Sequence, residues 1–257
     1  MEFDYIIIGG GTAGCVLANR LSANPKTNVL LLEAGKSDNY HWVHVPIGYL
    51  YCIGNPRTDW MMKTAAEPGL NGRTLSYPRG KLLGGCSSVN GMIYMRGQAA
   101  DYDGWRQMGN AGWGWDDVLP YFLKSEDHHN PDQPLHNVGG EWKVARQRLR
   151  WEVLETVQQG AKEFGIEPTA DFNGGTNEGS GFFEVNQKNG VRWNTAKAFL
   201  RPALKRKNLK VMTGAFTRRV IIEGKRAVGV EFERDMQTLQ ATARAEVILA
   251  AGAINSP

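Results

Sequence analysis

A glycine-rich turn between two short apolar runs constrains this fold more than any other feature of the chain. Residues 5–8 are a continuous apolar run, typical of a parallel strand that is covered on both faces. Gly9, Gly11 and Gly14 follow with the spacing G-x-G-x-x-G, and residues 29–32 form a second apolar run. This order predicts a βαβ unit that binds a dinucleotide.

The residues between the two runs have the pattern of a helix. Ala13, Leu17 and Leu21 recur at intervals of four, with Val16 beside them, so one apolar stripe can lie on a sheet. The helix is predicted to end near residues 24–25, where Asn precedes Pro.

The three glycines have different roles in such a unit. Gly9 permits the sharp turn, Gly11 lets the backbone approach a pyrophosphate, and Gly14 lets the helix and strand pack closely. The phosphates would lie at the positive end of the helix dipole, beside Thr12 and Ala13. These residues do not by themselves separate NAD from FAD.

An acidic residue follows the second apolar run. Glu33 stands 19 residues after Gly14, close to where dinucleotide-binding units carry a ribose-binding carboxylate. We expect Glu33 to accept hydrogen bonds from the adenosine ribose and to repel a 2′-phosphate.

The glycine content and the net charge each indicate what kind of partner the chain can bind. The chain has 31 glycines in 257 residues, and close approach of backbone to a ligand is one reason for such an excess. The net charge of +4 is too small to indicate nucleic-acid binding, and the basic runs at residues 146–150 and 205–207 have no aromatic ladder. No nucleic-acid partner is therefore expected.

The cysteines and the N-terminus indicate the compartment. Cys15, Cys52 and Cys86 are odd in number and widely spaced, which argues against a disulfide framework and a structural zinc site. The chain enters a strand soon after Met1, without a basic and apolar leader, and has no run of 18 apolar residues. We expect a cytoplasmic protein, or one peripheral at the inner membrane.

Residues 77–97, YPRGKLLGGCSSVNGMIYMRG, are suited to holding a flavin ring. Gly80, Gly84 and Gly85 leave backbone bare beside the small residues 86–88, so several N–H groups can converge on one acceptor. Donors near the polar edge of the ring would stabilise the charge of a reduced flavin.

This segment closely resembles the first signature of the glucose-methanol-choline (GMC) oxidoreductases, FAD-dependent enzymes that oxidise alcohols. The terminal GAINSP resembles the opening of the second signature of that family, and the resemblance runs along essentially the whole chain. It is closest to the bacterial choline and aliphatic alcohol dehydrogenases. The resemblance implies an α/β fold: an FAD-binding, Rossmann-like domain of the two-dinucleotide-fold type with a β-meander, and part of an α+β substrate domain.

The resemblance also implies which residues hold FAD. The matching positions are Trp60, Arg79, Gly80, Gly84, Gly85, Ser87, Asn90 and Gly91. The backbone near Thr217 would meet the adenine, and Gly252 would lie beside the cofactor at the end of a returning strand. Val89 occupies the position of a histidine that bonds FAD covalently in some members, so FAD is expected to bind non-covalently.

From residue 209 onward the chain is predicted to form a β-meander. The predicted strands are residues 209–213, 219–222, 228–232 and 239–243, and residues 247–250 return as another buried strand. The last residues, Asn255, Ser256 and Pro257, have the pattern of a helix N-terminus. We therefore expect the chain to be truncated inside an element, with about the second half of the enzyme absent.

The middle of the chain differs from the two ends in its residue composition, which suggests a division into three parts. These are residues 1–102, the first part of the FAD-binding domain; 103–201, a segment of the substrate or cap region; and 202–257, the meander and return strand. Within the middle part, residues 151–164 are predicted to form a helix that packs into a core by one apolar face. That face consists of Trp151, Leu154, Val157, Ala161 and Phe164.

The histidines do not predict a metal site. His41 and His44 could share a helical face, and His128, His129 and His136 share a loop. No acidic or cysteine partner stands at ligand spacing, so no metal is assigned.

The reaction that the resemblance implies is oxidation of a primary alcohol to an aldehyde, with hydride transfer to flavin N5 and removal of the hydroxyl proton by a base. In the family that base is a histidine, with a histidine or asparagine beside it, beyond the second signature. The five histidines of this chain do not match that motif, so no catalytic residue is assigned.

The implied partners are an alcohol, an electron acceptor such as a quinone, oxygen or a carrier, and the missing C-terminal half. Two alternatives remain open: a stand-alone FAD-binding fragment without turnover, and a member similar to the hydroxynitrile lyases of the family.

Overall fold

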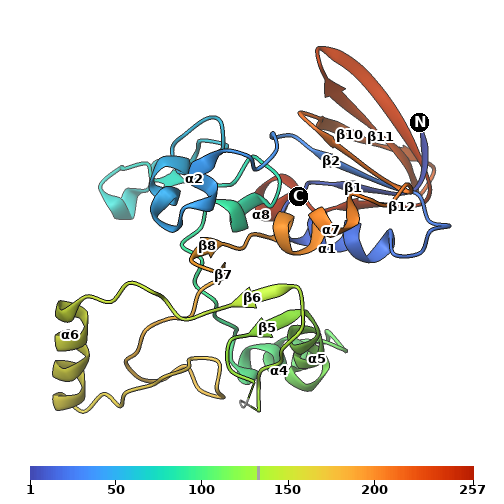
Figure 1. Cartoon of the computed structure of the whole chain (residues 1–257). Helices are drawn as coiled ribbons and strands as arrows, with labels where there is room; N and C mark the ends of the chain where they lie inside the picture. The colour runs from blue at the N-terminus through green and yellow to red at the C-terminus, as the bar shows by residue number, and fades with distance from the viewer. Residues whose placement is uncertain (132–133) are drawn as a thin grey trace. The chain divides into compact units, whose positions relative to one another are not determined.

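The computed structural model describes residues 1–131 and 134–257, and the chain divides into two compact units (Figure 1). The first unit comprises Met1–Gly91 and Asn194–Pro257, and the second comprises Met92–Trp193. Each boundary falls before the one suggested by the sequence, at residues 102 and 201.

Hydrogen bonds explain both differences. In the second unit, the Tyr94 N–H donates to the Glu184 carbonyl at 2.9 Å, so the chain joins this unit before residue 103. In the first unit, Asn19 Nδ2 donates to the Phe199 carbonyl at 2.7 Å, so the chain has already returned before residue 202.

The first unit is built on a six-stranded sheet with the order β10-β11-β12-β1-β2-β9 (Figure 1). Its strands are β1 (Glu2–Ile8), β2 (Val29–Glu33), β9 (Leu209–Thr213), β10 (Phe216–Glu223), β11 (Arg226–Arg234) and β12 (Gln237–Leu249). Its other elements are α1 (Thr12–Leu21), α2 (His41–His44), η1 (Pro46–Gly48), α3 (Tyr49–Cys52), β3 (Met62–Lys63), η2 (Pro68–Leu70), β4 (Ser76–Tyr77), η3 (Gly85–Ser88), η4 (Ala196–Leu200), α7 (Arg201–Ala203) and α8 (Gly252–Asn255).

The two apolar runs predicted as parallel strands are confirmed as β1 and β2. Ile6 of β1 lies opposite Leu30 of β2 on one side and Val247 of β12 on the other, and both pairings are parallel. All five residues of β2 are buried, as expected of a strand covered on both faces.

The C-terminal strands differ from the prediction in two ways. Residues 209–213 form β9, which pairs in parallel with β2 and is not part of the meander. The two strands predicted at 239–243 and 247–250 are one strand of 13 residues, β12. Its first part pairs antiparallel with β11 and its second part pairs in parallel with β1, so one long strand joins the meander to the parallel sheet without a turn.

Helix α1 is confirmed between β1 and β2, but its buried face was predicted wrongly. The buried residues are Gly14, Cys15, Ala18 and Asn19, whereas Ala13 of the predicted stripe is exposed. Small residues face the sheet because the helix approaches it closely. The helix ends at Leu21, earlier than the predicted end at residues 24–25. The next residue, Ser22, donates its hydroxyl to the Ala18 carbonyl at 2.6 Å.

The second unit has short strands and three helices in its described residues, 92–131 and 134–193. Its elements are α4 (Ala99–Gln107), α5 (Trp115–Ser125), β5 (Glu126–His128), β6 (Trp142–Val144), α6 (Glu152–Glu163), β7 (Gln187–Lys188) and β8 (Val191–Arg192). Strand β5 pairs in parallel with β6, and β7 pairs antiparallel with β8.

The predicted helix at residues 151–164 is present as α6, but its predicted core packing is wrong. All residues of α6 are described and none is buried. Val157 is 62% exposed and Phe164, just after the helix, is 87% exposed. Figure 1 shows α6 joined to the rest of its unit by extended segments, and among the described residues its apolar face stays exposed.

The two units have different interiors. In the first, one apolar cluster includes Ile6, Leu30 and Phe232, all fully buried. In the described part of the second, the buried apolar side chains are Met92, Val144 and Val185. Its buried polar and charged side chains are Arg96, Glu126, His128, His136, Asn173, Glu184, Asn186 and Arg192. Polar groups therefore make up most of the second interior.

The last residues differ from the sequence-based expectation. Gly252–Asn255 form the short helix α8, where a helix had been predicted to begin at Asn255. The Ser256 hydroxyl accepts a hydrogen bond from the Ala251 N–H at 3.1 Å, so it contacts the amide that precedes this helix.

The helices of the described residues are short, and the longest of them, α6, has 12 residues. None of them combines the length and the apolar character that crossing a membrane requires.

Candidate cofactor site

A cavity of about 920 Å³ lies in the first unit at the carboxyl ends of its parallel strands. Ile8 closes β1, Glu33 closes β2 and Leu249 closes β12, and all three line the cavity. Open α/β sheets bind their ligands at this edge of the sheet. The volume lies in the range of pockets that hold organic cofactors.

The glycine turn after β1 forms the base of the cavity. Gly9 has a φ of 104°, and a Cβ there would lie 2.5 Å from the Ala250 carbonyl oxygen. A Cβ on Gly14 would overlap the Gly9 carbonyl oxygen, whereas a Cβ on Gly11 would come no closer than 3.9 Å to Gly85. The sharp turn and the close helix packing are thus present, and the backbone of Gly11 is open to the cavity.

A second glycine loop packs directly on the first. A Cβ on Gly85 would lie 2.8 Å from the Gly11 Cα atom, and a Cβ on Gly80 would overlap the Gly85 carbonyl. The Gly84 N–H donates to the Gly10 carbonyl at 2.7 Å. Two segments about 75 residues apart therefore present bare backbone to one space, as a site that cradles phosphates and a planar ring requires.

Glu33 is held rigidly at the edge of this cavity. Its carboxylate accepts the Gly10 N–H through Oε2 and the Gly35 N–H through Oε1, each at 2.7 Å. Burial raises the pKa of Glu33 to about 7, although these two N–H groups and the Lys81 charge act in the opposite direction. A carboxylate has about four lone-pair sites, so two remain for donors inside the cavity.

Aromatic side chains form another wall. The rings of Trp60 and Phe216 lie 6.0 Å apart and both line the cavity. The Lys81 ammonium lies 4.6 Å from the centre of the Trp60 ring, within the range of a cation–π contact.

The structure brings most of the predicted cofactor residues together. Those that line the cavity are Gly9, Gly11, Thr12, Ala13, Glu33, Trp60, Arg79, Gly80, Gly85, Thr217 and Gly252. Those outside the lining are Gly14, Gly84, Ser87, Asn90 and Gly91.

The residues outside the lining have other positions. Gly14 and Gly84 support the turns, as described above, and the buried Ser87 hydroxyl donates to the Gly84 carbonyl at 2.6 Å. Asn90 and Gly91 are exposed at the end of the first unit's N-terminal segment.

Sequence reasoning missed the start of β10. Phe216, Arg218 and Arg219 line the cavity, but the predicted strand began at residue 219. The two arginines also pair across to β11, Arg218 with Glu233 and Arg219 with Glu231. Phe216 and Thr217, an aromatic and a β-branched residue of the kind favoured in strands, were the available signal.

Two finer predictions concern Val89 and Thr217. Val89 is 4% exposed and packs in an apolar cluster with Val43, Cys52 and Leu82. Thr217 lines the cavity, and its Oγ1 atom is buried without a hydrogen-bond partner among the described residues.

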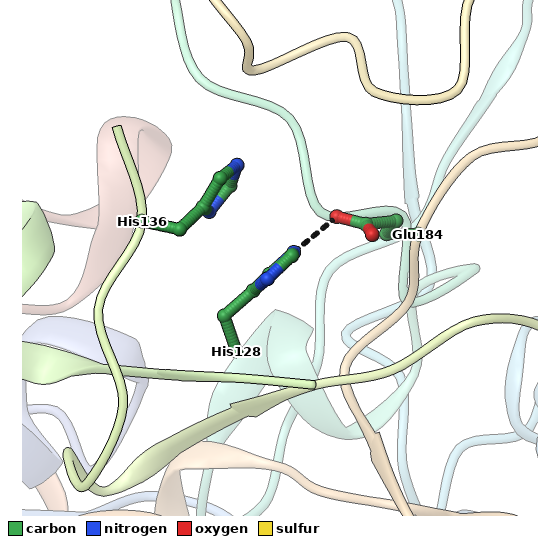
Figure 2. A group of neighbouring side chains, drawn as sticks. All are labelled: His128, His136 and Glu184. Carbon is green, nitrogen blue, oxygen red and sulfur yellow. Dashed lines mark hydrogen bonds and ion pairs between the residues drawn. The ribbon is translucent and has the colours of Figure 1, made fainter. Parts of the chain in front are cut away.

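The histidines predicted to lack acidic partners do have them in the second unit, which corrects the sequence interpretation. His128, His136 and Glu184 each offer an atom of a type that binds metals, within 4.8 Å of one another (Figure 2). Glu126 also contacts His136, and it shares one face of β5 with His128 because the two are separated by two positions. That spacing was a usable signal, whereas Glu184 is distant in the sequence.

The geometry of these groups favours an ionic cluster over a metal centre. The rings of His128 and His136 are stacked, with centroids 3.8 Å apart and planes 19° apart (Figure 2), and their nitrogens already have partners within the protein. The ring nitrogens of His136 face Glu126 and Asp171, and those of His128 face Glu184 and the Asn130 carbonyl.

The fold and the cavity define a class of protein. A parallel sheet, a glycine turn leading into a helix and a buried carboxylate at the end of the next strand make up a dinucleotide-binding α/β unit. The chain belongs to the GMC oxidoreductase family, because the family model matches residues 3–257.

Relatives of known name agree with this assignment. The chain is 42% identical to an alcohol dehydrogenase [acceptor] of Pseudomonas putida over 258 residues, which cover 99% of this chain and 47% of that protein. It is also 42% identical to an oxygen-dependent choline dehydrogenase of Brucella suis biovar 1 (strain 1330), covering 100% of this chain and 47% of the relative. The chain therefore spans about half the length of these curated relatives.

Solved structures show the same fold. Pyridoxine 4-oxidase from Mesorbium loti superposes with a TM-score of 0.95 at 32% identity, covering 99% of this chain and 50% of that one. An FAD-dependent oxidoreductase from Chaetomium thermophilum gives a TM-score of 0.90 at 28% identity, covering 97% of this chain and 45% of that one. Family and neighbours together imply FAD as the cofactor.

Proposed function

We propose that this chain forms the FAD-binding part of an oxidoreductase that converts the CH–OH group of a primary alcohol to an aldehyde. The observation that carries the proposal is the cavity between the two glycine loops, with Glu33 fixed at its edge. FAD, when bound, supplies the acceptor for the hydride that leaves the alcohol carbon.

The residues present fit this cofactor. The start of α1 offers unpaired backbone N–H groups and a positive dipole end beside Gly11, which suit a pyrophosphate. The free lone pairs of Glu33 suit the ribose hydroxyls of the adenosine part. The second glycine loop and Trp60 suit the flavin ring, and the backbone near Thr217 suits the adenine.

We propose that FAD is held non-covalently. The position of the family's flavin-linking histidine is Val89, which has no nucleophile and packs in an apolar cluster. We assign no base for the hydroxyl proton of the alcohol, since the described histidines of the first unit, His41 and His44, do not line the cavity.

The two alternatives raised by the sequence are not favoured. The relatives are named as dehydrogenases, and the neighbours include oxidases, which supports redox turnover over a fragment without turnover or a lyase. We propose a small alcohol as substrate and oxygen, a quinone or a carrier as electron acceptor. Cys15, Cys52 and Cys86 form no disulfide among the described residues, which supports a reducing, cytoplasmic location.

The test compares FAD binding by the 257-residue chain and by its Gly11→Ala variant. A Cβ on Gly11 meets no atom closer than 3.9 Å, so the variant should fold, but the methyl group would block the approach of a pyrophosphate. We expect the parent chain to quench flavin fluorescence with one FAD per chain and the variant to bind FAD more weakly. Equal binding by both, or a preference for NAD over FAD, would contradict the proposal.

The reaction itself is tested with the chain extended by the downstream half found in its relatives. We expect alcohol-dependent reduction of a dye by the extended protein. Flavin that no alcohol reduces would overturn the redox assignment while leaving FAD binding intact.

A further inference from the structure

The interior of the second unit contains a cluster of charged side chains that the proposed function does not use. Its members are Tyr94, Arg96, Glu126, His128, His129, His136, Asp171 and Glu184, here called the ionic cluster. They come from the segment before α4, from β5 and the loop after it, and from the segments around residues 171 and 184.

His136 is at the centre of the cluster and is fully buried. Its Nδ1 lies 2.9 Å from Glu126 Oε1, and its Nε2 lies 3.0 Å from Asp171 Oδ2. The side chains of His136 and Glu126 are both 0% exposed. An ionised carboxylate only accepts hydrogen bonds, so both ring nitrogens must carry a proton for both contacts to form. His136 is therefore an imidazolium cation in this arrangement.

The charges of the cluster balance only if histidines carry protons. Its three carboxylates face one permanent cation, Arg96, whose Nη2 donates to Glu126 Oε1 at 2.9 Å. His128 and His129 both contact the third carboxylate, Glu184, at 2.8 and 2.6 Å. Burial raises the pKa of the Tyr94 hydroxyl, so that group stays neutral. Without histidine protons the buried carboxylates would be left in excess, which is costly.

The cluster also connects the backbone of distant segments. Arg96 Nη1 donates to the Leu135 carbonyl at 2.7 Å, and the Arg96 N–H donates to Asn173 Oδ1 at 2.8 Å. The Asn137 N–H donates to Glu126 Oε2 at 2.9 Å. These bonds hold together the segments that carry the ionic groups.

Hydrophobic burial contributes little to the stability of this unit. Its buried apolar side chains among the described residues are Met92, Val144 and Val185. The fold of the second unit should therefore depend on the ionic cluster.

We propose that the proton on His136 is a structural cation of the second unit, so that this unit opens reversibly when His136 is deprotonated at alkaline pH, while the first unit keeps its fold.

The direction of the pH dependence follows from the neighbours of His136. Burial alone would lower the pKa of His136, but the hydrogen bonds to Asp171 and Glu126 outweigh it and raise the pKa from 6.5 to about 9. A pKa raised by folding gives a stabilisation that is complete below about pH 6.5 and is lost as the pH rises through 9. The pKa values of Glu126, Asp171 and Glu184 are lowered although burial opposes this, so these groups stay ionised over that window.

The neighbouring histidine acts in the same direction. Burial and the charge of His136 oppose protonation of His128, but its bonds to Glu184 and Asn130 raise its pKa. Each pKa unit between folded and open states is a tenfold change in the opening equilibrium. The shift of His136 therefore predicts that opening increases by roughly two orders of magnitude between about pH 6.5 and 9.5.

The test is hydrogen–deuterium exchange of the whole 257-residue chain, read peptide by peptide from pH 6 to 10 and corrected for intrinsic exchange. We expect the opening constant of peptides from β5 and β6 to rise about a hundredfold, and that of peptides from β1 and β2 to stay within a few fold. His136→Gln should remove most of this slope, leaving only the smaller contribution of His128, and His41→Gln, at an exposed histidine of the first unit, should retain it in full.

A direct measurement on the unmodified chain covers the case in which His136→Gln does not fold. Ring-nitrogen chemical shifts of ¹⁵N-histidine should show one fully buried histidine doubly protonated at pH 7.5. A neutral His136 at that pH, or opening of the second unit that is independent of pH, would overturn the proposal. Stoichiometric Zn²⁺ binding at neutral pH that His136→Gln abolishes would also overturn it, since the cluster would then be a metal site.

Discussion

Ile6 and Phe232 in the first unit and Glu126 and His136 in the second are comparably buried, yet they stabilise their surroundings by different means. The apolar groups of the first unit stabilise its fold by leaving water, and this stabilisation depends little on pH and little on any single partner. The charged groups of the second unit stabilise its fold only while each partner remains in its ionised form. The comparison teaches that one chain can combine a robust cofactor unit with a unit whose stability is set by solution conditions.

The largest effect is expected from Gly14→Ala, which tests how closely the first unit is packed. The new Cβ would overlap the Gly9 carbonyl oxygen and meet Leu31 Cδ1 at 3.4 Å. Because backbone cannot move aside like a side chain, we expect a cost above the roughly 1–3 kcal/mol of ordinary overpacking, with loss of FAD binding. Denaturant unfolding and flavin fluorescence measure both.

A matched control is Gly104→Ala in α4. Its Cβ would meet no atom within 4 Å, so helix propensity predicts stabilisation by up to about 1 kcal/mol. Similar destabilisation by both substitutions would show that the close approach of α1 to β1 is not what makes Gly14 necessary.

The next effect is expected from Glu126→Gln in the ionic cluster. This change leaves Arg96 and His136 without their shared carboxylate. Breaking a buried ion pair by removing one partner costs about 3–5 kcal/mol, so peptides of the second unit should exchange as if open. FAD affinity of the first unit should change less than about twofold if the two units are energetically separate. Exchange that rises equally in β1 and β2 would break the comparison.

A smaller effect is expected from Glu33→Gln in the cofactor cavity. The substitution removes the negative charge and turns one acceptor oxygen into a donor beside the Gly10 or Gly35 N–H. Hydrogen bonds to a charged group are each worth about 1.5–3 kcal/mol, so FAD affinity should fall by about one to two orders of magnitude. Glu246→Gln, at an exposed position of β12, is the control and should bind FAD like the parent chain. Unchanged affinity in Glu33→Gln would mean that the carboxylate only supports the loop.

The pH dependence of FAD affinity should be weaker still. Burial raises the pKa of Glu33 to about 7, so the carboxylate that accepts ribose hydroxyls forms mainly above neutrality. Affinity should therefore rise between pH 6 and 8, by at most about tenfold, because the ionised fraction rises by that factor. Glu33→Gln should show no rise. This slope is opposite in sign to the stability of the second unit, which falls as the pH increases.

The parallel part of the fold could be predicted because its information is local. The apolar runs of β1 and β2 and the glycine turn between them occupy about 30 consecutive residues. The residue types in this segment indicate directly which positions are buried and where the chain turns. Part of the cavity lining followed from that turn and from the family signature at residues 77–97.

The rest depends on contacts between distant residues. Nothing near residues 237–249 indicates that one strand will pair antiparallel with β11 and then in parallel with β1. Asp171 and Glu184 reach His136 and His128 from 35 and 56 positions away, so the ionic cluster could not be predicted from spacing. The exposure of α6 was missed because an apolar stripe indicates what a helix can bury and does not identify its partner.

The smallest effect is expected on that helix face. Val157 of α6 is 62% exposed, and α6 has no buried residues, so Val157→Ser removes little buried surface. Surface substitutions usually change the free energy of unfolding by less than about 0.5 kcal/mol. Val144→Ser is the matched comparison in the same unit: at 2% exposure it should cost more than about 1 kcal/mol, because it buries a hydroxyl and leaves a void. Equal costs at the two valines would mean that α6 packs against another surface in solution, and the second unit would then have an apolar contribution to its stability beside the ionic cluster.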